Sequence, residues 1–390
     1  MFPPVKRLLS TYIIAALILG WQFVDPDGGR GQPSNEIRVQ IIKSAPELSI
    51  KINGGYEVYD INNEGKLLEG TDLDTTARAW KSGLVWRGEN LKTDSVFIKP
   101  ADPEGIAINK RKYRGSIRII RNDSFSLSVI NYLDLEDYVK GIAVRETSHY
   151  WPVEALKAQA VVFRSFAFYQ TTRNRTKDFD VTSDVYSQVY GGKQAERYRI
   201  NDAVDQTKGE VLVYNGRILP AFYHSTCGGH TEDASFLWNI NIPALKGVAC
   251  YFCQDSPHFN WRASLDNNSL KNYLAKAGYK IKRVKSISIL HRDRSGRVVD
   301  LQIDTDSAGI KISAKDFRNM IGPDMIRSAN FTLKSGPGGS EFSGLGWGHG
   351  VGLCQWGAYF QAKLGGLYRE ILGFYYPGSS IVLLSKLNAG

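Results

Sequence analysis

Residues 135–146 read LEDYVKGIAVRE, and in this stretch the apolar periodicity of the chain changes from two residues to about 3.6. One helical face carries the apolar side chains of Leu135, Tyr138, Val139 and Ile142. Glu146 comes next on that face. A carboxyl group that faces packed side chains is costly as an anion, so its pKa should rise and it should be protonated more often near neutral pH. The stretch therefore predicts a helix that presents Glu146 as a candidate general acid, the alternative being a glutamate at a helix end that reaches water.

A second helix is predicted directly after the first, over residues 151–169. Pro152 suits the first helical position and Glu154 suits the first turn. Apolar residues cover much of its circumference: Leu156, Ala160, Val162, Phe163, Phe166, Ala167 and Tyr169. This helix should therefore lie in the middle of the molecule, and its polar members Gln159 and Arg164 would each need a partner if buried.

The remaining pattern predicts an α+β fold. Residues 36–130 are expected to form a β-rich N-terminal domain with hairpins at Asn53-Gly54 and Asn122-Asp123, because these dipeptides tolerate positive φ. Residues 131–385 are expected to form a mixed α+β core, with a further hairpin at Asn215-Gly216. A strand is also expected at Val298–Ile303, after a turn-forming segment.

The N-terminal segment, residues 1–35, predicts export. Lys6 and Arg7 precede an apolar stretch at 12–21 that is short for a membrane span and suits a secretory signal. No clear cleavage site follows, so an uncleaved membrane anchor stays open, as does a buried helix of the fold. A linker rich in Gly, Pro and Asp follows at 25–34. We expect an extracytoplasmic protein, secreted or anchored to the cytoplasmic membrane.

Composition agrees with a globular chain that has an anionic partner. Aromatic residues make up 12% and hydrophobic residues 43% of the 390 residues, which argues against disorder. The 49 basic and 39 acidic residues give a net charge of +10, which suits nucleic acid, a membrane surface or an acidic cell-wall polymer. An export signal disfavours nucleic acid.

Four of the residues between 227 and 253 have the spacing of a zinc site. Cys227 and His230 form one pair, Cys250 and Cys253 form another, and each pair encloses two residues. Two such pairs can supply the four ligands of a structural tetrahedral Zn²⁺ site. The alternative is one disulfide among the three cysteines with His230 uninvolved, as an oxidising compartment allows; His224 is a possible substitute ligand.

Near the C-terminus, residues 344–358 read GLGWGHGVGLCQWGA. So many glycines permit backbone conformations that are closed to other residues and let a ligand or another segment approach closely. His349, Gln355 and Trp356 are candidates for lining a sugar site, with the indole stacked on a ring; the alternative is a tight turn with an aromatic plug before a helix at about 355–364. No Gly-Lys-Ser/Thr follows, so this is not a phosphate loop.

Five ordered motifs between about residues 130 and 380 resemble the stage II sporulation protein D family, also called SpoIID/LytB. They are YVKGIAVRE (138–146) with WP (151–152) and EALKAQA (154–160), SQVYGG (187–192), HSTCGGHTE (224–232), GHGVG (348–352) with QWGA (355–358), and YYPG (375–378). Cys354 departs from the family pattern, which more often has serine or another small residue there. Phe163-Arg164-Ser165 also replaces the usual Ala-Arg-Thr.

The resemblance implies a lytic transglycosylase that cleaves peptidoglycan glycan strands, preferentially strands without stem peptides. The catalytic glutamate of the family matches Glu146, and some members bind zinc near the segment that contains Cys227. The expected substrate-binding residues are Gln159, Arg164, Gln188, Tyr190, His224, Ser225, His349, Gln355 and Trp356.

With Glu146 as acid and then base, the C6 hydroxyl of N-acetylmuramic acid would attack C1 and leave a 1,6-anhydro end, so no second carboxylate is required. The family also contains enhancers of cell-wall amidases. The alternative function is therefore a non-catalytic wall-binding protein that stimulates an amidase.

Overall fold

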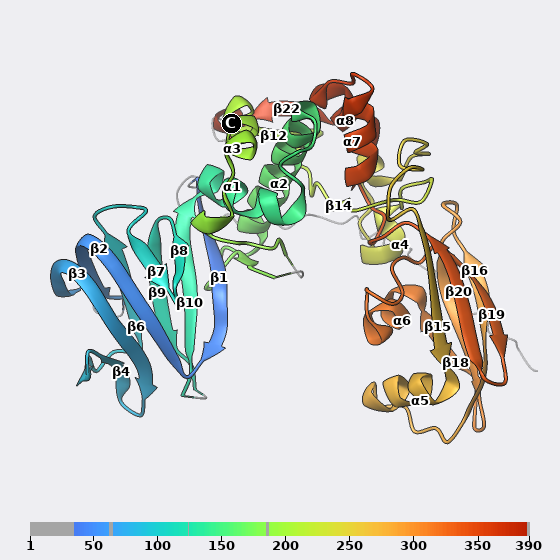
Figure 1. Ribbon diagram of the computed structural model, residues 1–390, viewed down its shortest axis with the longest axis horizontal. Helices are drawn as coiled ribbons and strands as arrows, with labels where there is room; N and C mark the ends of the chain where they lie inside the picture. The colour runs from blue at the N-terminus through green and yellow to red at the C-terminus, as the bar shows by residue number, and fades with distance from the viewer. Residues whose placement is uncertain (1–34, 62–64, 124, 185–186, 388–390) are drawn as a thin grey trace, which may run out of the picture. The chain divides into compact units, whose positions relative to one another are not determined.

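Figure 1 shows the computed structural model of the chain, which describes residues 35–61, 65–123, 125–184 and 187–387. The export or anchor segment expected over 1–35 lies outside these ranges except for Asn35. The described residues belong to one compact unit. In the described ranges, no helix combines the length and the apolar composition needed to cross a membrane.

Helices and strands alternate irregularly along the chain, and the fold is α+β as expected. The helices are α1 (Leu135–Glu146), α2 (Val153–Arg173), α3 (Tyr198–Gln206), α4 (Ala234–Trp238), α5 (Asn267–Lys276), α6 (Ala314–Ile321), α7 (Gln355–Lys363), α8 (Tyr368–Tyr375) and α9 (Leu384–Leu387), with 3₁₀ turns at Lys193–Ala195 and Pro243–Leu245.

The strands before α1 are β1 (Glu36–Ala45), β2 (Glu47–Asp60), β3 (Gly65–Trp80), β4 (Gly83–Trp86), β5 (Glu89–Asn90), β6 (Ser95–Pro100), β7 (Ile106–Ile108), β8 (Arg111–Tyr113), β9 (Ser116–Arg121) and β10 (Leu127–Asp134). The later strands are β11 (Val181–Thr182), β12 (Glu210–Tyr214), β13 (Arg217–Ile218), β14 (Tyr223–His224), β15 (Asn260–Asp266), β16 (Val284–Arg292), β17 (Val298–Thr305), β18 (Ile310–Ser313), β19 (Phe331–Gly336), β20 (Gly339–Leu345), β21 (Leu353–Cys354) and β22 (Ser380–Leu383).

Within the described ranges, eleven strands form the N-terminal sheet. Its main path runs β11-β1-β10-β9-β6-β2-β3-β4-β5, and β7 and β8 pair beside β2. Strand β10 continues directly into α1, and the Asp134 side chain caps that helix by accepting from the Glu136 N–H at 2.8 Å. The boundary expected between residues 130 and 131 therefore falls inside β10.

The hairpin expected at Asn53-Gly54 is wrong. Strand β2 runs without a break from Glu47 to Asp60, and the dipeptide makes a bulge within it, where the register with β3 shifts between Ile52 and Gly55. The Gly54 N–H donates to the Asp72 carboxylate at 2.7 Å. The positive φ that suits a hairpin turn also suits a bulge, so the dipeptide alone did not distinguish them.

The hairpins expected at Asn122-Asp123 and Asn215-Gly216 are confirmed. The first joins β9 to β10 and the second joins β12 to β13. After β13 the chain leaves this sheet, and β14 pairs instead in parallel with β21, which lies more than a hundred residues later. This long-range pair brings the HSTCGGHTE segment and the QWGA segment side by side.

The helices α1 and α2 pack against each other, and their apolar side chains share one hydrophobic core with those of the N-terminal sheet. The apolar face predicted for α1 is buried, and α2 is buried along most of its length, as expected for a central helix. The structure starts α2 at Val153, so Pro152 is its cap residue and not its first helical residue.

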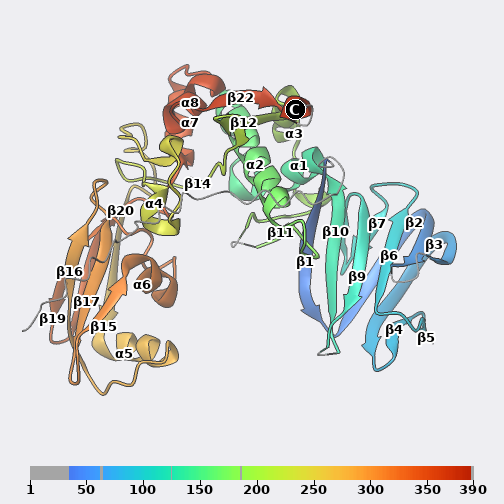
Figure 2. The same cartoon turned by 180° about the vertical axis from the view of Figure 1, so that it is seen from behind.

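A second hydrophobic core lies between β14 and β21 in the sequence. Strands β15 to β20 form two three-stranded sheets, and the helices α5 and α6 lie on one face of them (Figures 1 and 2). Strand β17 contains the strand expected at Val298–Ile303. We call residues 260–345 the inserted subdomain, because β14 and β21 pair with each other across it.

Candidate active site

Glu146 is the last residue of α1, and its side chain is half-buried. Its Oε1 accepts a hydrogen bond from the Val189 N–H at 2.9 Å, and the Tyr223 hydroxyl is a second partner of the carboxyl group. The helix ends here because Thr147 is extended. These contacts hold the carboxyl in one orientation at the end of an apolar helix face.

Burial raises the pKa of Glu146 above its ordinary value, because an anion there loses its hydration. The hydrogen bonds from Val189 and Tyr223 act in the opposite direction and lower it. Burial is the largest cause, so the net direction is upward. The carboxyl group is thus held protonated to a higher pH than an exposed glutamate, which is the state a general acid needs.

Glu146 opens onto a groove of about 490 Å³. The lining residues are Val144, Arg145, Glu146, Thr147, Ser148, Trp151, Ser225, His258, Trp347, Gln355 and Trp356. They come from the end of α1, the loop before α2, the segment after β14 and the start of α7, together with two residues that flank the inserted subdomain. Among the described residues that line it, Glu146 is the only carboxylate.

Three tryptophans make the groove wall aromatic. The rings of Trp151 and Trp356 lie 5.2 Å apart at the centroids, and Tyr359 packs at 5.2 Å from both. Trp347 is fixed by paired backbone hydrogen bonds with Thr226 at 2.8 and 3.0 Å. Flat indoles beside polar groups are typical of sites that bind sugar rings.

The glycines before Trp356 allow this close packing. A Cβ on Gly346 would lie 2.4 Å from the Thr226 carbonyl oxygen, and one on Gly352 would lie 2.0 Å from the Phe222 carbonyl oxygen. Both residues have positive φ. The glycine-rich stretch thus admits a neighbouring chain segment, one of the two uses expected from the sequence.

Gln355 joins the groove to the end of α1. Its Nε2 donates to the Glu146 backbone oxygen at 3.0 Å and to Gln159 Oε1 at 3.1 Å, and Gln159 in turn donates to the Thr147 hydroxyl at 3.3 Å. Gln355 lines the groove, whereas Gln159 is buried behind it. The expected pair of binding residues therefore divides into a lining residue and a residue that positions it.

Arg164, Gln188 and Tyr190 are buried and do not line the groove, and the partner of Arg164 lies at the opposite end of α1 from Glu146. The Arg164 guanidinium pairs with Glu136 at 2.6 and 2.8 Å and donates to backbone oxygens. Gln188 accepts from the Tyr138 hydroxyl at 3.2 Å. These residues, which motif position marked for substrate binding, support the helix pair instead.

Among the remaining expected binding residues, Ser225 lines the groove, and His224 and His349 lie behind it. His224 is buried, and its Nδ1 is 3.1 Å from the Val351 oxygen. His349 packs its ring against Trp238, 5.0 Å away at the centroids, and burial lowers its pKa to about 3. Burial also lowers the pKa of His224, so both imidazoles are neutral near pH 7, and neither ring lines the groove.

The four cysteines form a buried cluster, with every pair of Sγ atoms within 4.8 Å. Cys354 is the fourth member, and His230 is not in the cluster: its Nδ1 lies 2.6 Å from the Thr231 oxygen. All four are free thiols, and the Sγ atoms of Cys227 and Cys253 are 3.4 Å apart. A tetrahedral zinc site with bonds of about 2.3 Å separates its sulfurs by about 3.8 Å, so this cluster fits the ion.

Arg297 from the inserted subdomain holds the cysteine segment in place. Its guanidinium is buried and donates to the backbone oxygens of Cys227 at 2.6 Å and His230 at 2.8 Å. It also lies 3.9 Å from the buried carboxylate of Glu232. Because these partners belong to the segment after β14, Arg297 ties the subdomain to the cysteine cluster.

Sequence reasoning missed several residues of the site. His258 stands outside any recognisable local pattern, and Trp347 lies in the glycine-rich stretch 344–358 without being among the expected lining residues. The pattern around Tyr223 indicates a strand and the motif at Trp151-Pro152 indicates a helix start, so neither residue was expected to contact Glu146 or the groove. The departure at Cys354 was visible as an unusual residue, but its role depends on a contact with Cys227 across 127 positions.

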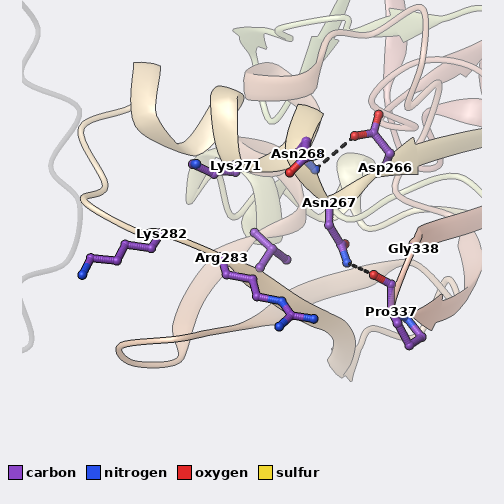
Figure 3. A pocket seen from close by; sticks show the side chains of 9 residues that line it. Asp266, Asn267, Asn268, Lys271, Lys282, Arg283, Pro337 and Gly338 are labelled. Carbon is purple, nitrogen blue, oxygen red and sulfur yellow. Dashed lines mark hydrogen bonds between the residues drawn. The ribbon is translucent and has the colours of Figure 1, made fainter.

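A second, smaller hollow of about 240 Å³ lies in the inserted subdomain (Figure 3). Lys271, Lys282 and Arg283 make its rim basic. It adjoins the start of α5, but the Asp266 carboxylate already accepts from the first N–H groups of that helix, at 2.9 and 3.0 Å. The hollow therefore lacks a free helix terminus that would hold an anion.

Comparison with known proteins agrees with the motifs. Residues 123–214 match the family model of the stage II sporulation protein (SpoIID), and residues 246–352 match a domain of unknown function, DUF8618. The chain is 36% identical to an uncharacterised protein of Brachyspira hyodysenteriae, over 91% of this chain and 95% of that one.

Two relatives in Bacillus subtilis carry names. The amidase enhancer is 31% identical over 75% of this chain and 48% of its own length. The stage II sporulation protein D is 29% identical over 75% of this chain and 85% of its own length. The ordered motifs, the matched model and these relatives together assign the chain to the SpoIID family.

Proposed function

We propose that this chain is a lytic transglycosylase that cleaves the bond between N-acetylmuramic acid and N-acetylglucosamine in peptidoglycan. The observation that carries the proposal is Glu146, a desolvated carboxyl group with a raised pKa that lines an aromatic groove. The groove offers indole faces for sugar rings and one group able to transfer a proton.

In the first step, Glu146 donates its proton to the glycosidic oxygen while positive charge develops at C1 of the muramic acid. The bond to the leaving N-acetylglucosamine breaks, and Glu146 becomes a carboxylate. The Val189 N–H and the Tyr223 hydroxyl stabilise that anion where it forms.

In the second step, the Glu146 carboxylate removes the proton from the C6 hydroxyl of the same muramic acid, and that oxygen attacks C1. This closes a 1,6-anhydro ring and returns Glu146 to its protonated state. Two-carboxylate glycosidases place their acids about 5 to 9.5 Å apart across the bond. The described groove lining holds no second carboxylate, which favours the intramolecular route.

We also propose that Cys227, Cys250, Cys253 and Cys354 hold a structural zinc ion. The support is the buried set of four cysteine sulfurs, which all lie within 4.8 Å of one another. Together they can fill all four ligand positions of a tetrahedral ion, as in structural zinc sites. Such an ion would join the segment after β14 to the segment before α7, and both of these line the groove.

An alternative is a wall-binding protein that stimulates an amidase, and the similarity to the B. subtilis amidase enhancer favours it. Mass spectrometry of the soluble products from peptide-free glycan strands distinguishes the two. Anhydro-muramic ends support the transglycosylase. Intact strands, together with faster stem-peptide release when an amidase is added, support the enhancer. Either function requires an extracytoplasmic location, which an export signal in residues 1–35 would provide.

A further inference from the structure

Part of the groove wall comes from the segment matched by the domain of unknown function. His258 and Trp347 both line the groove, and both lie within residues 246–352. Their rings meet edge to face with centroids 4.8 Å apart. This segment is thus in contact with the space that Glu146 faces.

Arg327 lies next to these two rings, and its charge acts on the neighbouring His258 imidazole. The Arg327 guanidinium lies over the Trp347 ring, 4.6 Å from its centroid. Its backbone is fixed, because its carbonyl oxygen accepts from the Gly348 N–H at 2.9 Å and from Arg318 Nε at 3.2 Å. Across the described residues, no carboxylate lies within ion-pair distance of this guanidinium.

Three other buried or partly buried arginines among the described residues have close polar partners. Arg38 binds Asp180 at 2.7 Å, Arg164 binds Glu136 at 2.6 Å, and Arg297 donates to backbone oxygens at 2.6 and 2.8 Å. Arg327 is half-buried and instead rests on an indole. A guanidinium held over an aromatic face keeps the N–H donors at its edge available.

We infer that Arg327, with Trp347 and His258, forms a subsite that binds a carboxylate carried by the glycan, and that this is what the segment of unknown function adds to the groove. The inference rests on the proposed function. In a strand of alternating sugars, N-acetylmuramic acid carries a lactyl carboxylate and N-acetylglucosamine does not. A guanidinium edge recognises such a carboxylate through two parallel hydrogen bonds.

The subsite would therefore set the register of the strand, because only alternate sugars can place a carboxylate there. A stem peptide joined at that position converts the carboxylate into an amide, so the subsite would give a physical cause for the preference for peptide-free strands that the family resemblance implies. The groove would then bind the strand in two ways, by stacking of sugar rings on its indoles and by pairing of one carboxylate with Arg327.

The test measures strand binding with cleavage switched off. Glu146→Gln protein is titrated with peptide-free glycan strands and, separately, with the same strands after their carboxylates have been converted to primary amides. We expect the amidated strands to bind about 10-fold more weakly, as for loss of a charged hydrogen bond. Adding Arg327→Gln should remove that difference by weakening only the binding of the untreated strands.

Two matched variants control for charge and folding. Arg262→Gln removes an exposed arginine of the same subdomain and should leave the preference for untreated strands intact. Arg327→Lys keeps the charge and should restore part of the preference. Thermal melting of each variant shows whether the fold survives.

The outcomes separate this inference from the proposed function. If Arg327→Gln weakens both kinds of strand equally, or neither, the inference is overturned even where the wild-type protein cleaves glycan. If the wild type releases no anhydro-muramic ends but the Arg327-dependent preference is present, the transglycosylase proposal fails and the carboxylate subsite stands.

Discussion

Replacing Glu146 with glutamine should abolish glycan cleavage and leave the fold intact. The amide keeps the size of the side chain and retains an oxygen that accepts from the Val189 N–H, now 2.9 Å from Oε1. It loses the proton that the carboxyl group transfers. The apolar face of α1 ends before this position, so no core contact is removed.

The expected loss of cleavage rate in Glu146→Gln follows from the role of Glu146 as general acid and base. General acid–base catalysis by one positioned group contributes roughly 10²- to 10⁴-fold. With about 1.4 kcal/mol for each factor of ten, this equals about 3 to 5 kcal/mol of the activation barrier. Glu146 would act twice in each turnover, so the loss should lie toward the upper end of that range.

The same substitution should change how stability depends on pH. Burial raises the pKa of Glu146 in the folded chain, so the folded state binds this proton more tightly than the unfolded state does. That stabilisation is complete below the pKa of an unfolded glutamate, about 4.3. It is lost as the pH rises through the raised pKa. Glutamine does not titrate, so Glu146→Gln should gain in stability relative to the wild type as the pH rises.

The assay is mass spectrometry of anhydro-muramic ends released from peptide-free strands, with melting temperatures measured from pH 4 to pH 8. Glu154→Gln is the matched control: its carboxylate pairs with Lys157 at 2.8 Å, and it is absent from the groove lining. Near wild-type turnover by Glu146→Gln would remove this residue from the acid–base role. A loss of turnover accompanied by unfolding would leave Glu146 with a structural role only.

Three further predictions concern the surroundings of Glu146. Tyr223→Phe removes a hydrogen bond that lowers the pKa of Glu146, so the alkaline limb of the pH–rate profile should move to higher pH; an unmoved limb would contradict this. Cys354→Ser should release zinc and lower the melting temperature whereas His230→Ala should retain the metal, as elemental analysis would show. Arg297→Met should destabilise the chain by about 2–4 kcal/mol in denaturant unfolding, because it leaves two buried backbone acceptors unpaired; a loss below 1 kcal/mol would disprove that role.

The sequence predicted the local parts of the site well. The α1 helix and the position of Glu146 at its end depend on side chains within one helical face, so a 3.6-residue period was enough to locate them. The turn at Asn215-Gly216 was equally local. The dipeptide Asn53-Gly54 failed because β2 pairs with β3 on one edge and with β6 and β7 on the other, which holds the strand extended through the bulge.

Burial and long-range partners could not be predicted. Arg164 and Gln188 stand in the same motifs as groove residues, but motif position does not say which side chains point into the core. Cys354 lies 101 positions after Cys253, with the inserted subdomain between them, so spacing within short pairs favoured His230 over the true neighbour. The parallel pairing of β14 with β21 is the contact that brings Cys354 to the cluster.

The chain enters and leaves the inserted subdomain beside the cysteine cluster, close to residues that line the groove. Cys253 precedes β15 and Cys354 forms the end of β21, so the cluster closes the two ends of the insertion against each other. Trp347 and Gln355 lie on either side of that returning strand, and both line the groove. Cys354 directly precedes Gln355, whose Nε2 donates to the Glu146 backbone oxygen at 3.0 Å. The cluster and the end of α1 are therefore separated by one residue and one hydrogen bond, which explains why the cysteines and the groove residues stand in the same motifs of the chain.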